Sequence, residues 1–395
     1  MKTERLYYDD AYLTRFEADV TGRGPDPCQV YLNCTAFYPA SGGQPADHGT
    51  IGGISVVDVV EDGDRIRHVT ARPVEAAHVE CEIDWARRFD HMQQHSGQHV
   101  LSAVLMELFG LETLSFHLGS EISTIDLDTA LLSPEQIRRA EERANQVIFE
   151  NRPVSVVYEE ASQARGLRKP SGRQGLLRIV VIEGLDRTGC GGTHVRATGE
   201  IGPLLIRKVD KIRGRARVEF LCGHRAVRRA RTDWETLARV ALLFSAPPDQ
   251  VPELVAGQRA RLREAEKARQ RLARELAEAR GRELYEKTAP DDSGLRKAVR
   301  QEPAGPVSDE LRAEARSFTE NPKAIFAAFL AEPPSVLLAA SADAGFHAGN
   351  LLKDVLSEFG GRGGGNARIA QGSLPAADAI GKLRARLLAR VSGGD

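Results

Sequence analysis

The first 85 residues alternate between short β-forming runs and clusters of turn residues. Three β-forming runs lie at 29–32, 55–60 and 78–83, and clusters of Gly, Pro and Asp such as 22–27 and 61–64 separate them. Runs of this length and composition predict strands. Several short strands at this spacing predict a small β-barrel over 1–85.

Residues 86–232 combine helical and strand patterns. Ser133 followed by Pro134 predicts the start of a helix that runs to about residue 151. Strands are predicted at 124–128, 154–158, 177–182, 202–209 and 216–221. An earlier helix is indicated by apolar positions at three-to-four spacing, namely Leu101, Val104, Leu105 and Leu108. Because strands and helices do not alternate regularly, the pattern favours an α+β fold over a doubly wound sheet.

The remaining chain divides into a helical connector and a further α/β unit. Residues 233–288 keep helical periodicity, interrupted near Ala246-Pro-Pro, and predict an exposed hairpin or short coiled coil. The apolar positions of this coiled coil, at three-to-four spacing, are Leu262, Ala265, Leu272, Leu276 and Ala279. This row, which Arg269 interrupts, suggests contact with a second copy in a homodimer. Residues 289–304 are predicted to be a linker. An α/β unit follows over 305–395, with a buried strand at 335–340 and helices at 349–359 and 376–391. The whole chain is therefore expected to be a multidomain α+β protein.

Composition places the chain among ordinary globular proteins and adds one local feature. With 395 residues, 42% of them hydrophobic and 28% charged, two or three folded units are expected. The net charge is only −1, yet residues 207–231 are strongly basic. Such a stretch either contacts phosphates or forms a solvated surface. Its cations are Arg207, Lys208, Lys211, Arg213, Arg215, Arg217, Arg225, Arg228, Arg229 and Arg231.

Cysteine usage and the N-terminus indicate a reducing, cytoplasmic setting without a membrane partner. The five cysteines are widely spaced and odd in number, which is not typical of a disulfide framework. The first residues lack an apolar signal core, and no run approaches the roughly 20 apolar residues that span a bilayer. A cysteine in this setting is free to act as a metal ligand.

Histidines and one cysteine form the clearest candidate for chemistry. His91, His95 and His99 recur every fourth residue, so a helix would place them along one face. Some ninety residues later, Cys190-Gly-Gly-Thr-His194 supplies a thiolate and another imidazole. One thiolate and three imidazoles suit tetrahedral Zn²⁺. The zinc is either catalytic or purely structural, and His91 is an alternative ligand, a partner of a ligand or a buried histidine bonded to backbone.

The histidine spacing matches the His-Glu-x-x-His motif of zinc proteases without its general base. Ser96 occupies the glutamate position after His95, and Met92 occupies it after His91. A protease mechanism with a helix-borne carboxylate is therefore disfavoured.

Two glycine-rich stretches remain. Gly42, Gly43 and Gln44 predict a tight loop that either approaches a ligand or simply closes a hairpin with polar residues. The run 360–365 lacks the Gly-Lys-Ser/Thr of a phosphate loop. Its glycines either offer amide groups to a phosphate or pack closely against another backbone segment.

These motifs together resemble a known family. His95-Ser-Gly-Gln-His99 and Cys190-Gly-Gly-Thr-His194 resemble the paired zinc motifs of the alanyl-tRNA synthetase editing domain. The stretch from Phe37 to Gln44, with Asp47, is similar to the glycine-rich loop of that family, and the run 360–365 resembles the glycine motif of its C-terminal domain. The order matches the freestanding, long (AlaX-type) alanyl-tRNA editing proteins, without the amino-acid-activating portion of the synthetases.

The resemblance implies a zinc-dependent hydrolase acting on tRNA(Ala) mischarged with serine, or also with glycine. It implies a metal site formed by His95, His99, Cys190 and His194. The same resemblance puts Gln44 near the scissile ester and Thr35 where it senses the serine hydroxyl. Zinc would activate water, polarise the carbonyl or position the substrate, and the C-terminal unit would bind tRNA.

Three other functions compete with this one. A non-catalytic tRNA-binding module would use zinc only to hold its fold. A phosphoesterase is suggested by the C-terminal unit, but Asp90-His91-Met92 falls short of the Asp-His-His cluster that such enzymes use. A threonyl-tRNA editor is related, yet the Gly-Gly-Gln loop and C-terminal domain favour the alanine type.

Overall fold

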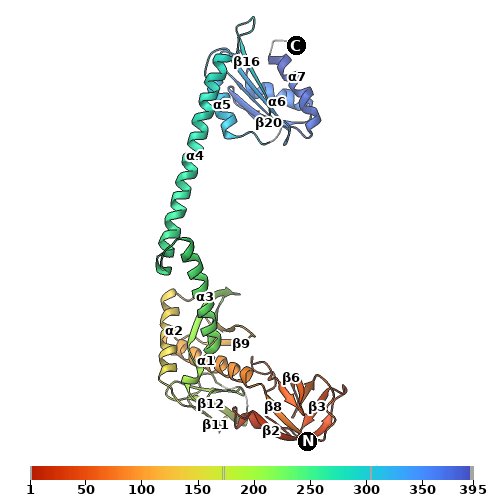
Figure 1. The fold of residues 1–395 in the computed structure, drawn as a ribbon, viewed down its shortest axis with the longest axis vertical. Coiled ribbons are helices and arrows are strands. Elements are labelled where there is room, and N and C mark those ends of the chain that lie inside the picture. Colours follow the sequence, from red (N-terminus) through yellow and green to blue (C-terminus); the bar gives the residue numbers. More distant parts are fainter. Residues whose placement is uncertain (1, 171, 173, 303–304, 392–395) are drawn as a thin grey trace. The chain divides into compact units, whose positions relative to one another are not determined.

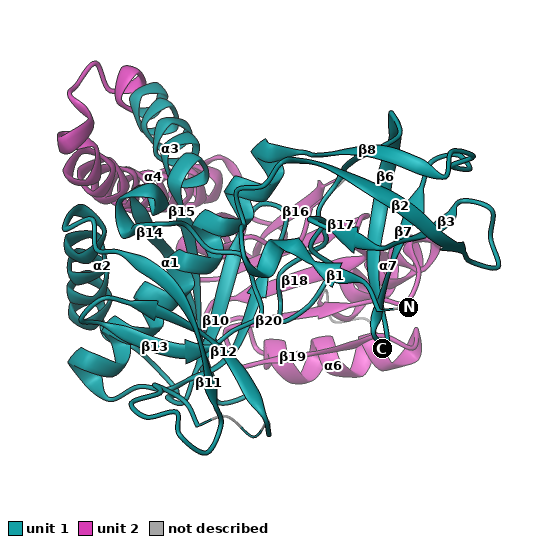
Figure 2. Cartoon of the chain, turned by 90° about the horizontal axis from the view of Figure 1, so that it is seen from below, with its two compact units in different colours: residues 1–240 teal, residues 241–395 magenta. Residues whose placement is uncertain are grey.

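The fold is described from a computed structural model that covers residues 2–170, 172, 174–302 and 305–391. Positions 303–304 of the predicted linker and 392–395 of the predicted C-terminal unit lie outside these residues. The chain divides into two compact units, 1–240 and 241–395 (Figure 2). Both units contain helices and strands, which confirms the mixed α+β class.

Six antiparallel strands near the N-terminus close into a barrel. Their order is β2 (Arg15–Arg23), β3 (Gln29–Leu32), β7 (Arg65–Thr70), β6 (Ile54–Asp62), β5 (Gly49–Ile51) and β8 (His78–Ile83). Burial alternates along β8, so Val79, Cys81 and Ile83 point into the barrel while their neighbours face solvent. Outside the barrel, β1 (Glu4–Arg5) pairs in parallel with β4 (Cys34–Thr35). The 3₁₀ turn η1 (Leu6–Tyr8), β2 and β3 lie between these two strands in the chain.

Beyond the barrel, two helices pack on a four-stranded antiparallel sheet (Figure 1). The helices are α1 (Trp85–Phe109) and α2 (Pro134–Phe149). Ser133 and Gln136 form a reciprocal cap at the start of α2, as the sequence predicts. The sheet order is β14 (Leu204–Ile212), β15 (Arg215–Cys222), β10 (Ser123–Leu127) and β9 (Thr113–Leu118).

A smaller, three-stranded sheet precedes the loop that contains Cys190 and His194. Its strands are β11 (Val154–Glu160), β12 (Leu176–Ile182) and β13 (Asp186–Gly189). The 3₁₀ turn η2 (Thr198–Ile201) follows this sheet and contacts α1 and α2.

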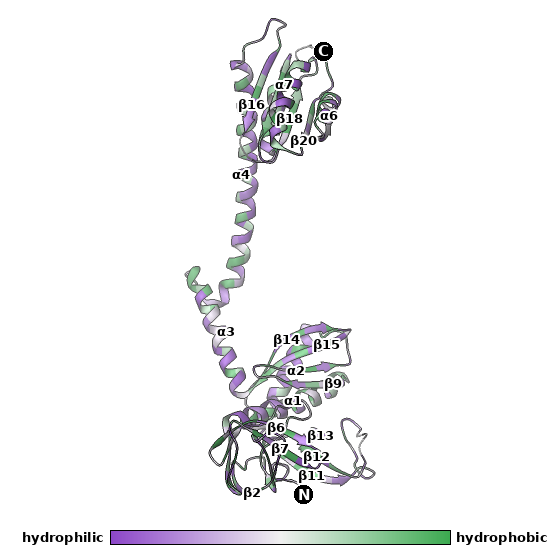
Figure 3. Cartoon of the chain, turned by 90° about the vertical axis from the view of Figure 1, so that its right-hand side faces the viewer, coloured by the Kyte–Doolittle hydropathy of each residue, from purple (hydrophilic) through white to green (hydrophobic). Residues whose placement is uncertain are grey.

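The predicted helical region consists of α3 (Gly223–Leu243) and α4 (Val251–Lys287), separated by η3 (Pro248–Gln250). The break coincides with the two prolines, and α3 starts directly after β15, ten residues before the predicted boundary. Figure 3 shows hydrophilic and hydrophobic residues interspersed along α4. Leu262, Leu272 and Leu276 on this helix are more than half exposed. No helix among the described residues has the length and apolar character needed to cross a bilayer.

The second unit is a five-stranded sheet with helices on both faces. Its order is β16 (Arg296–Glu302), β17 (Ala324–Leu330), β18 (Ser335–Ala340), β20 (Ile369–Ser373) and β19 (Arg362–Gly365). Every residue of β17 and β18 is buried. Alternate residues of β17 pack with α6 (Ala348–Glu358) and α7 (Ile380–Val391) on one face, and with α5 (Asp309–Thr319) and the end of α4 on the other. A strand covered on both faces is continuously apolar, as β17 is.

Two segments of this unit differ from the expectation. Residues 296–302, inside the predicted linker, form β16 and pair in parallel with β17. This is an edge strand, so its many charged residues can face solvent while Ala298 is buried. The glycine run forms strand β19, which pairs with β20, rather than an open loop. A side chain at Gly363 would lie 2.5 Å from Leu356 Cδ1 of α6, so glycine is needed there. Gly361, Gly363 and Gly365 are therefore closely packed, whereas an added Cβ at Gly364 would meet nothing within 4 Å.

Candidate metal centre

Helix α1 carries two of the predicted ligands through the interior of the first unit. Asp84 caps the helix by accepting a hydrogen bond from Arg87 N, and Gly110 ends it with a left-handed backbone (φ 66°). All residues from 91 to 105 are buried. A side chain at Gly97 would lie 2.2 Å from Cys222 Sγ, so glycine is needed here for α1 to pack against β15.

The loop after β13 supplies the other two ligands. Arg178 on β12 fixes this loop, because its Nη1 donates to the carbonyls of Cys190 (2.8 Å) and Gly192 (3.0 Å). Gly192 lies directly against the imidazole of His95, where an added Cβ would be 2.2 Å from Cε1. The glycine at this position therefore lets the loop reach α1.

Four ligand atoms converge between α1 and this loop. The ligating atoms of His95, His99, Cys190 and His194 all lie within 4.8 Å of one another. Cys190 Sγ is 3.4 Å from His95 Nε2 and 3.3 Å from His194 Nε2. Tetrahedral zinc with ordinary Zn–S and Zn–N bonds separates sulfur from nitrogen by about 3.6 Å. These two sulfur–nitrogen distances are within a few tenths of an ångström of that value.

Each imidazole is oriented by a hydrogen bond at its other nitrogen. His95 Nδ1 bonds Gln44 Oε1 (2.8 Å), His99 Nδ1 bonds Asp186 Oδ2 (3.1 Å) and His194 Nδ1 bonds Ser96 Oγ (3.1 Å). With a proton on Nδ1 donated to these oxygens, the lone pair of each Nε2 is directed at the common centre. Such bonds fix the ring and its tautomer at metal sites.

The protonation of the group also favours a cation. Burial alone would raise the pKa of the Cys190 thiol, but the imidazoles of His95 and His194 beside it lower that pKa well below its usual value. Burial would likewise raise the pKa of Asp186, whereas His99 and Arg168 lower it to about 2. Burial lowers the pKa of His99, but its bonds to Asp186 and Cys190 raise that pKa to about 9. The thiolate and the carboxylate are therefore negative at neutral pH and are balanced by a protonated His99, whose place a bound cation could take.

The Gly-Gly-Gln loop is tied to both ligand-bearing segments. Gln44 Nε2 donates to Thr193 Oγ1 (2.8 Å) of the metal loop while its Oε1 accepts from His95. Asp47 forms a fully buried ion pair with Arg88 of α1, with Nε at 3.0 Å from Oδ2. Both side chains of the motif therefore hold the loop against α1.

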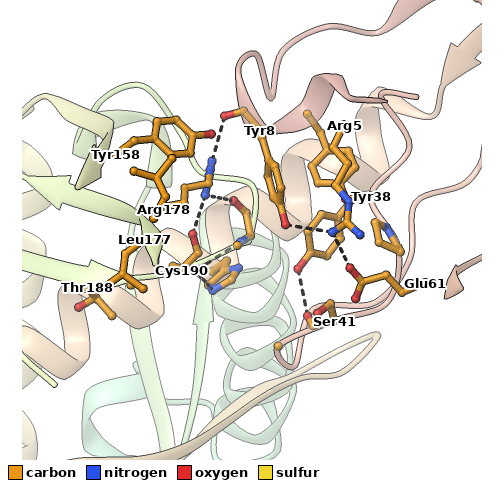
Figure 4. A pocket seen from close by; sticks show the side chains of 18 of the residues that line it. Arg5, Tyr8, Tyr38, Ser41, Glu61, Tyr158, Leu177, Arg178, Thr188 and Cys190 are labelled. Carbon is orange, nitrogen blue, oxygen red and sulfur yellow. Dashed lines mark hydrogen bonds and ion pairs between the residues drawn. The ribbon is translucent and has the colours of Figure 1, made fainter. Parts of the chain in front are cut away.

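A cavity of about 570 Å³ adjoins the metal group (Figure 4). Cys190 and His95 line it, together with glycines 189, 191 and 192. Figure 4 shows Tyr8, Tyr38 and Arg5 of the N-terminal segment on one side and Tyr158, Leu177 and Arg178 on the other. A substrate in this cavity would touch two of the four ligand residues.

Comparison with known proteins identifies the family. The model of the threonyl and alanyl tRNA synthetase second additional domain matches residues 177–217, and that of the DHHA1 domain matches 306–393. Alanyl-tRNA editing protein AlaX-L of Pyrococcus horikoshii is 32% identical over 417 residues, covering 97% of this chain and 99% of the relative. The chain belongs to the alanyl-tRNA editing protein family.

Other relatives share only part of their length with this editing protein. Alanyl-tRNA editing protein Aarsd1 of Rattus norvegicus is 40% identical over 207 residues, covering 51% of the chain and 50% of the relative. Alanine–tRNA ligase of Pyrococcus abyssi is 31% identical over 396 residues, and the chain spans only 42% of the length of that ligase. The match to the second additional domain includes Cys190 and His194.

The structure separates His91 from the predicted metal ligands of the editing protein. Successive positions four apart on an α-helix drift by about 40°, so His91 points about 80° away from His99. Its side chain is buried, and its Nδ1 has no hydrogen-bond partner in the described part of the chain. Burial, with Arg87 and Arg225 nearby, lowers its pKa to about 3. His91 is thus a neutral core residue outside the group of four candidate ligands.

Thr35 and Gln44 have partners that the sequence did not indicate. Gln44 bonds His95 and Thr193, as described above, and is 1% exposed. Thr35 lies inside the barrel, where its Oγ1 is 2.8 Å from His68 Nε2 and accepts a bond from Phe37 N. Neither of these two side chains is among the described residues that line the cavity beside the metal group. Asp186 and Arg178, by contrast, hold the ligands and were not predicted.

Proposed function

We propose that this protein hydrolyses the ester of tRNA(Ala) mischarged with serine, and also with glycine, at a zinc site formed by His95, His99, Cys190 and His194. The supporting observation is the convergence of these four ligand atoms, with all three imidazoles held at Nδ1. The relatives named alanyl-tRNA editing proteins support the substrate class.

The donor set fits zinc. Three imidazoles and one thiolate are borderline ligands that suit Zn²⁺ in tetrahedral sites. When bound, zinc supplies Lewis-acid chemistry, either to a water molecule or carbonyl group or by anchoring the α-amino group of the substrate.

Gln44 and Arg178 would hold the candidate metal ligands in place during the reaction. Gln44 links His95 to the metal loop, and Arg178 holds the carbonyls of Cys190 and Gly192. The loop therefore keeps a fixed position beside the cavity in which the ester would bind. Rigid support of this kind lowers the cost of organising the site during the reaction.

Thr35 would distinguish serine from alanine by its hydroxyl. His68 Nδ1 lies 3.3 Å from Val30 O, which can only accept, so Nε2 accepts from Thr35 Oγ1. Burial lowers the pKa of His68 to about 4, which keeps the ring neutral. The Thr35 proton is thereby committed, so only its oxygen could accept a bond from a serine hydroxyl. Because Thr35 is fully buried and does not line the cavity, the serine side chain would have to enter the barrel to reach it. A site that expects a hydrogen bond can reject an analogue that lacks the hydroxyl by about 10⁴-fold.

Steady-state deacylation of Ser-tRNA(Ala) by the full chain tests the function. The expected result is release of serine by the wild type and its loss, together with the metal, in Cys190→Ala. Cys28→Ala, in a partly exposed position of the barrel, is the control and should keep both. A protein that instead protects the ester from spontaneous hydrolysis would be the binding module considered above.

The second unit would contribute tRNA binding. A groove of about 840 Å³ between α4 and α5 is lined by six cations, namely Lys267, Arg269, Arg271, Arg274, Arg312 and Arg316, and by four acidic residues. Cationic grooves bind phosphates, and the affinity then falls steeply with salt. We also propose cytoplasmic action, where charged tRNA is used, and a homodimer through residues 233–288, which a single species of monomer mass in analytical ultracentrifugation would contradict.

A further inference from the structure

Asp186 of β13 supports the candidate ligand His99 from inside the protein. Its Oδ2 lies 3.1 Å from His99 Nδ1, and its side chain is completely buried. Burying a carboxylate is costly unless a cation pairs with it and its oxygens are hydrogen-bonded. The remaining partners of Asp186 therefore determine how firmly it can hold the imidazole.

The guanidinium of Arg168 supplies such a cation. Arg168 Nε donates to Asp186 Oδ1 at 2.8 Å, and its Nη2 lies 3.5 Å from Oδ2. The same Nη2 donates to Thr188 Oγ1 (3.2 Å), and this hydroxyl lies 3.0 Å from each carboxylate oxygen. A planar guanidinium presents its donors in a rigid fork. Arg168 thus fixes the plane of the carboxylate, which keeps Oδ2 directed at His99.

Arg168 also belongs to a segment that forms a wall of the cavity beside the metal group. Lys169 and Pro170, which follow it, are exposed and line this cavity, and Thr188 lines it as well. The Arg168 side chain, by contrast, is only 12% exposed. Its backbone N donates to Arg187 O (2.8 Å), so both backbone and side chain attach the segment to β13. Arg168 is therefore the residue at which this wall is joined to the support of His99.

We propose that Arg168 is a positioning residue, which joins this wall of the cavity to His99 through Asp186. The inference rests on the proposed function, because it takes the cavity to hold the ester and His99 to hold the ion. With Arg168 in place, the wall and the imidazole keep one position relative to each other. A displacement of about 1 Å between reacting groups can cost on the order of 100-fold in rate. The guanidinium should therefore contribute to kcat more than to substrate affinity.

The first experiment compares Arg168→Met with the wild type, both as the full chain. Methionine keeps an unbranched apolar stem and removes the guanidinium. Zinc affinity, measured by competition with a chromophoric chelator, should fall about 10–100-fold, as it does when other residues that support ligands are lost. Arg165→Met is the matched control, because it removes an exposed arginine of the same segment whose side chain bonds the carbonyls of Ser162 and Ala164. Equal zinc affinity in Arg168→Met and Arg165→Met overturns the proposal.

The second experiment measures deacylation of Ser-tRNA(Ala) with excess zinc. Arg168→Met should lower kcat about tenfold or more while KM changes by less than about twofold. Arg168→Lys keeps the charge but can bond Asp186 or Thr188 and not both, so its kcat should fall between those of the wild type and Arg168→Met. Methylguanidinium should restore kcat in Arg168→Ala, whose fold is checked by circular dichroism. A raised KM with unchanged kcat, or no rescue of a folded Arg168→Ala, overturns the positioning role.

These outcomes separate the role of Arg168 from the proposed function. If the wild type binds zinc and fails to hydrolyse Ser-tRNA(Ala), the hydrolase is refuted, and lower zinc affinity in Arg168→Met still supports the link to His99. If the wild type hydrolyses the ester and Arg168→Met does so with the same kcat and zinc affinity, the function stands and the positioning role is overturned.

Discussion

Replacing Gly192 with alanine tests how the metal loop and α1 fit together. An added Cβ would lie 2.2 Å from Cε1 and 2.4 Å from Nδ1 of His95, and 3.1 Å from Oε1 of Gln44. Ordinary contact begins at 3.4 Å, so the methyl group would overlap the ring by about 1 Å. Either the loop or the imidazole must move.

The ring has little room to respond. Gln44 holds its Nδ1 at 2.8 Å, and the ring of Phe116 lies 5.2 Å from it, centroid to centroid. Overpacking of this size costs about 1–3 kcal/mol of folding free energy. Disturbing a residue that merely supports a ligand lowers metal affinity by about 10–100-fold. Displacing the ligand itself should therefore cost at least about 100-fold in zinc affinity.

Competition with a chromophoric chelator measures that affinity. Gly191→Ala is a matched control, since its Cβ would meet only Tyr8, at 3.6 Å, and it should retain zinc. Equal zinc affinity in Gly192→Ala and the wild type would refute the geometry of the loop against His95.

Three further outcomes are expected. Asp186→Asn weakens the support of His99 and should lower zinc affinity about 10–100-fold. Asp126→Asn, in a partly buried ion pair with Arg217, should leave zinc affinity unchanged, and chelator competition measures both variants. Thr35→Val should slow deacylation of Ser-tRNA(Ala) while zinc content stays constant, and unchanged Ser/Ala selectivity would contradict its role. The metal-free protein should lose stability as pH falls below about 6.5, because His91, with its pKa lowered to about 3, stays neutral when folded but takes up a proton when unfolded. Denaturant titrations from pH 7 to 4 give the change of the free energy of unfolding with pH. His91→Gln should reduce this slope by up to about 1.4 kcal/mol per pH unit, and an identical slope in the variant would speak against burial of a neutral ring.

Local patterns in the sequence were sufficient for many elements and for the four side chains that converge at the candidate metal site. The reciprocal cap at Ser133 defines the start of α2, and the spacing of His95 and His99 follows from the geometry of one helix. Cys190 and His194 lie in a short glycine-rich segment, and this segment can be recognised in the sequence without knowledge of the fold. Such features depend on neighbours a few residues apart, which sequence reasoning handles well.

Long-range contacts account for what the sequence did not provide. Asp186 bonds a histidine 87 residues earlier in the chain, and no pattern around it marks a metal-supporting carboxylate. Gln44 was recognised, but its partner 51 residues away was not. Strand β16 was assigned to a linker because an edge strand tolerates charged residues and so carries little hydrophobic signal.

X-ray absorption at the zinc edge of the purified full chain tests the central claim most directly. The account predicts one zinc ion per chain with three nitrogen neighbours at about 2.0–2.1 Å and one sulfur neighbour at about 2.3 Å. A protein that binds no zinc, or a spectrum that lacks sulfur and imidazole neighbours, would contradict it.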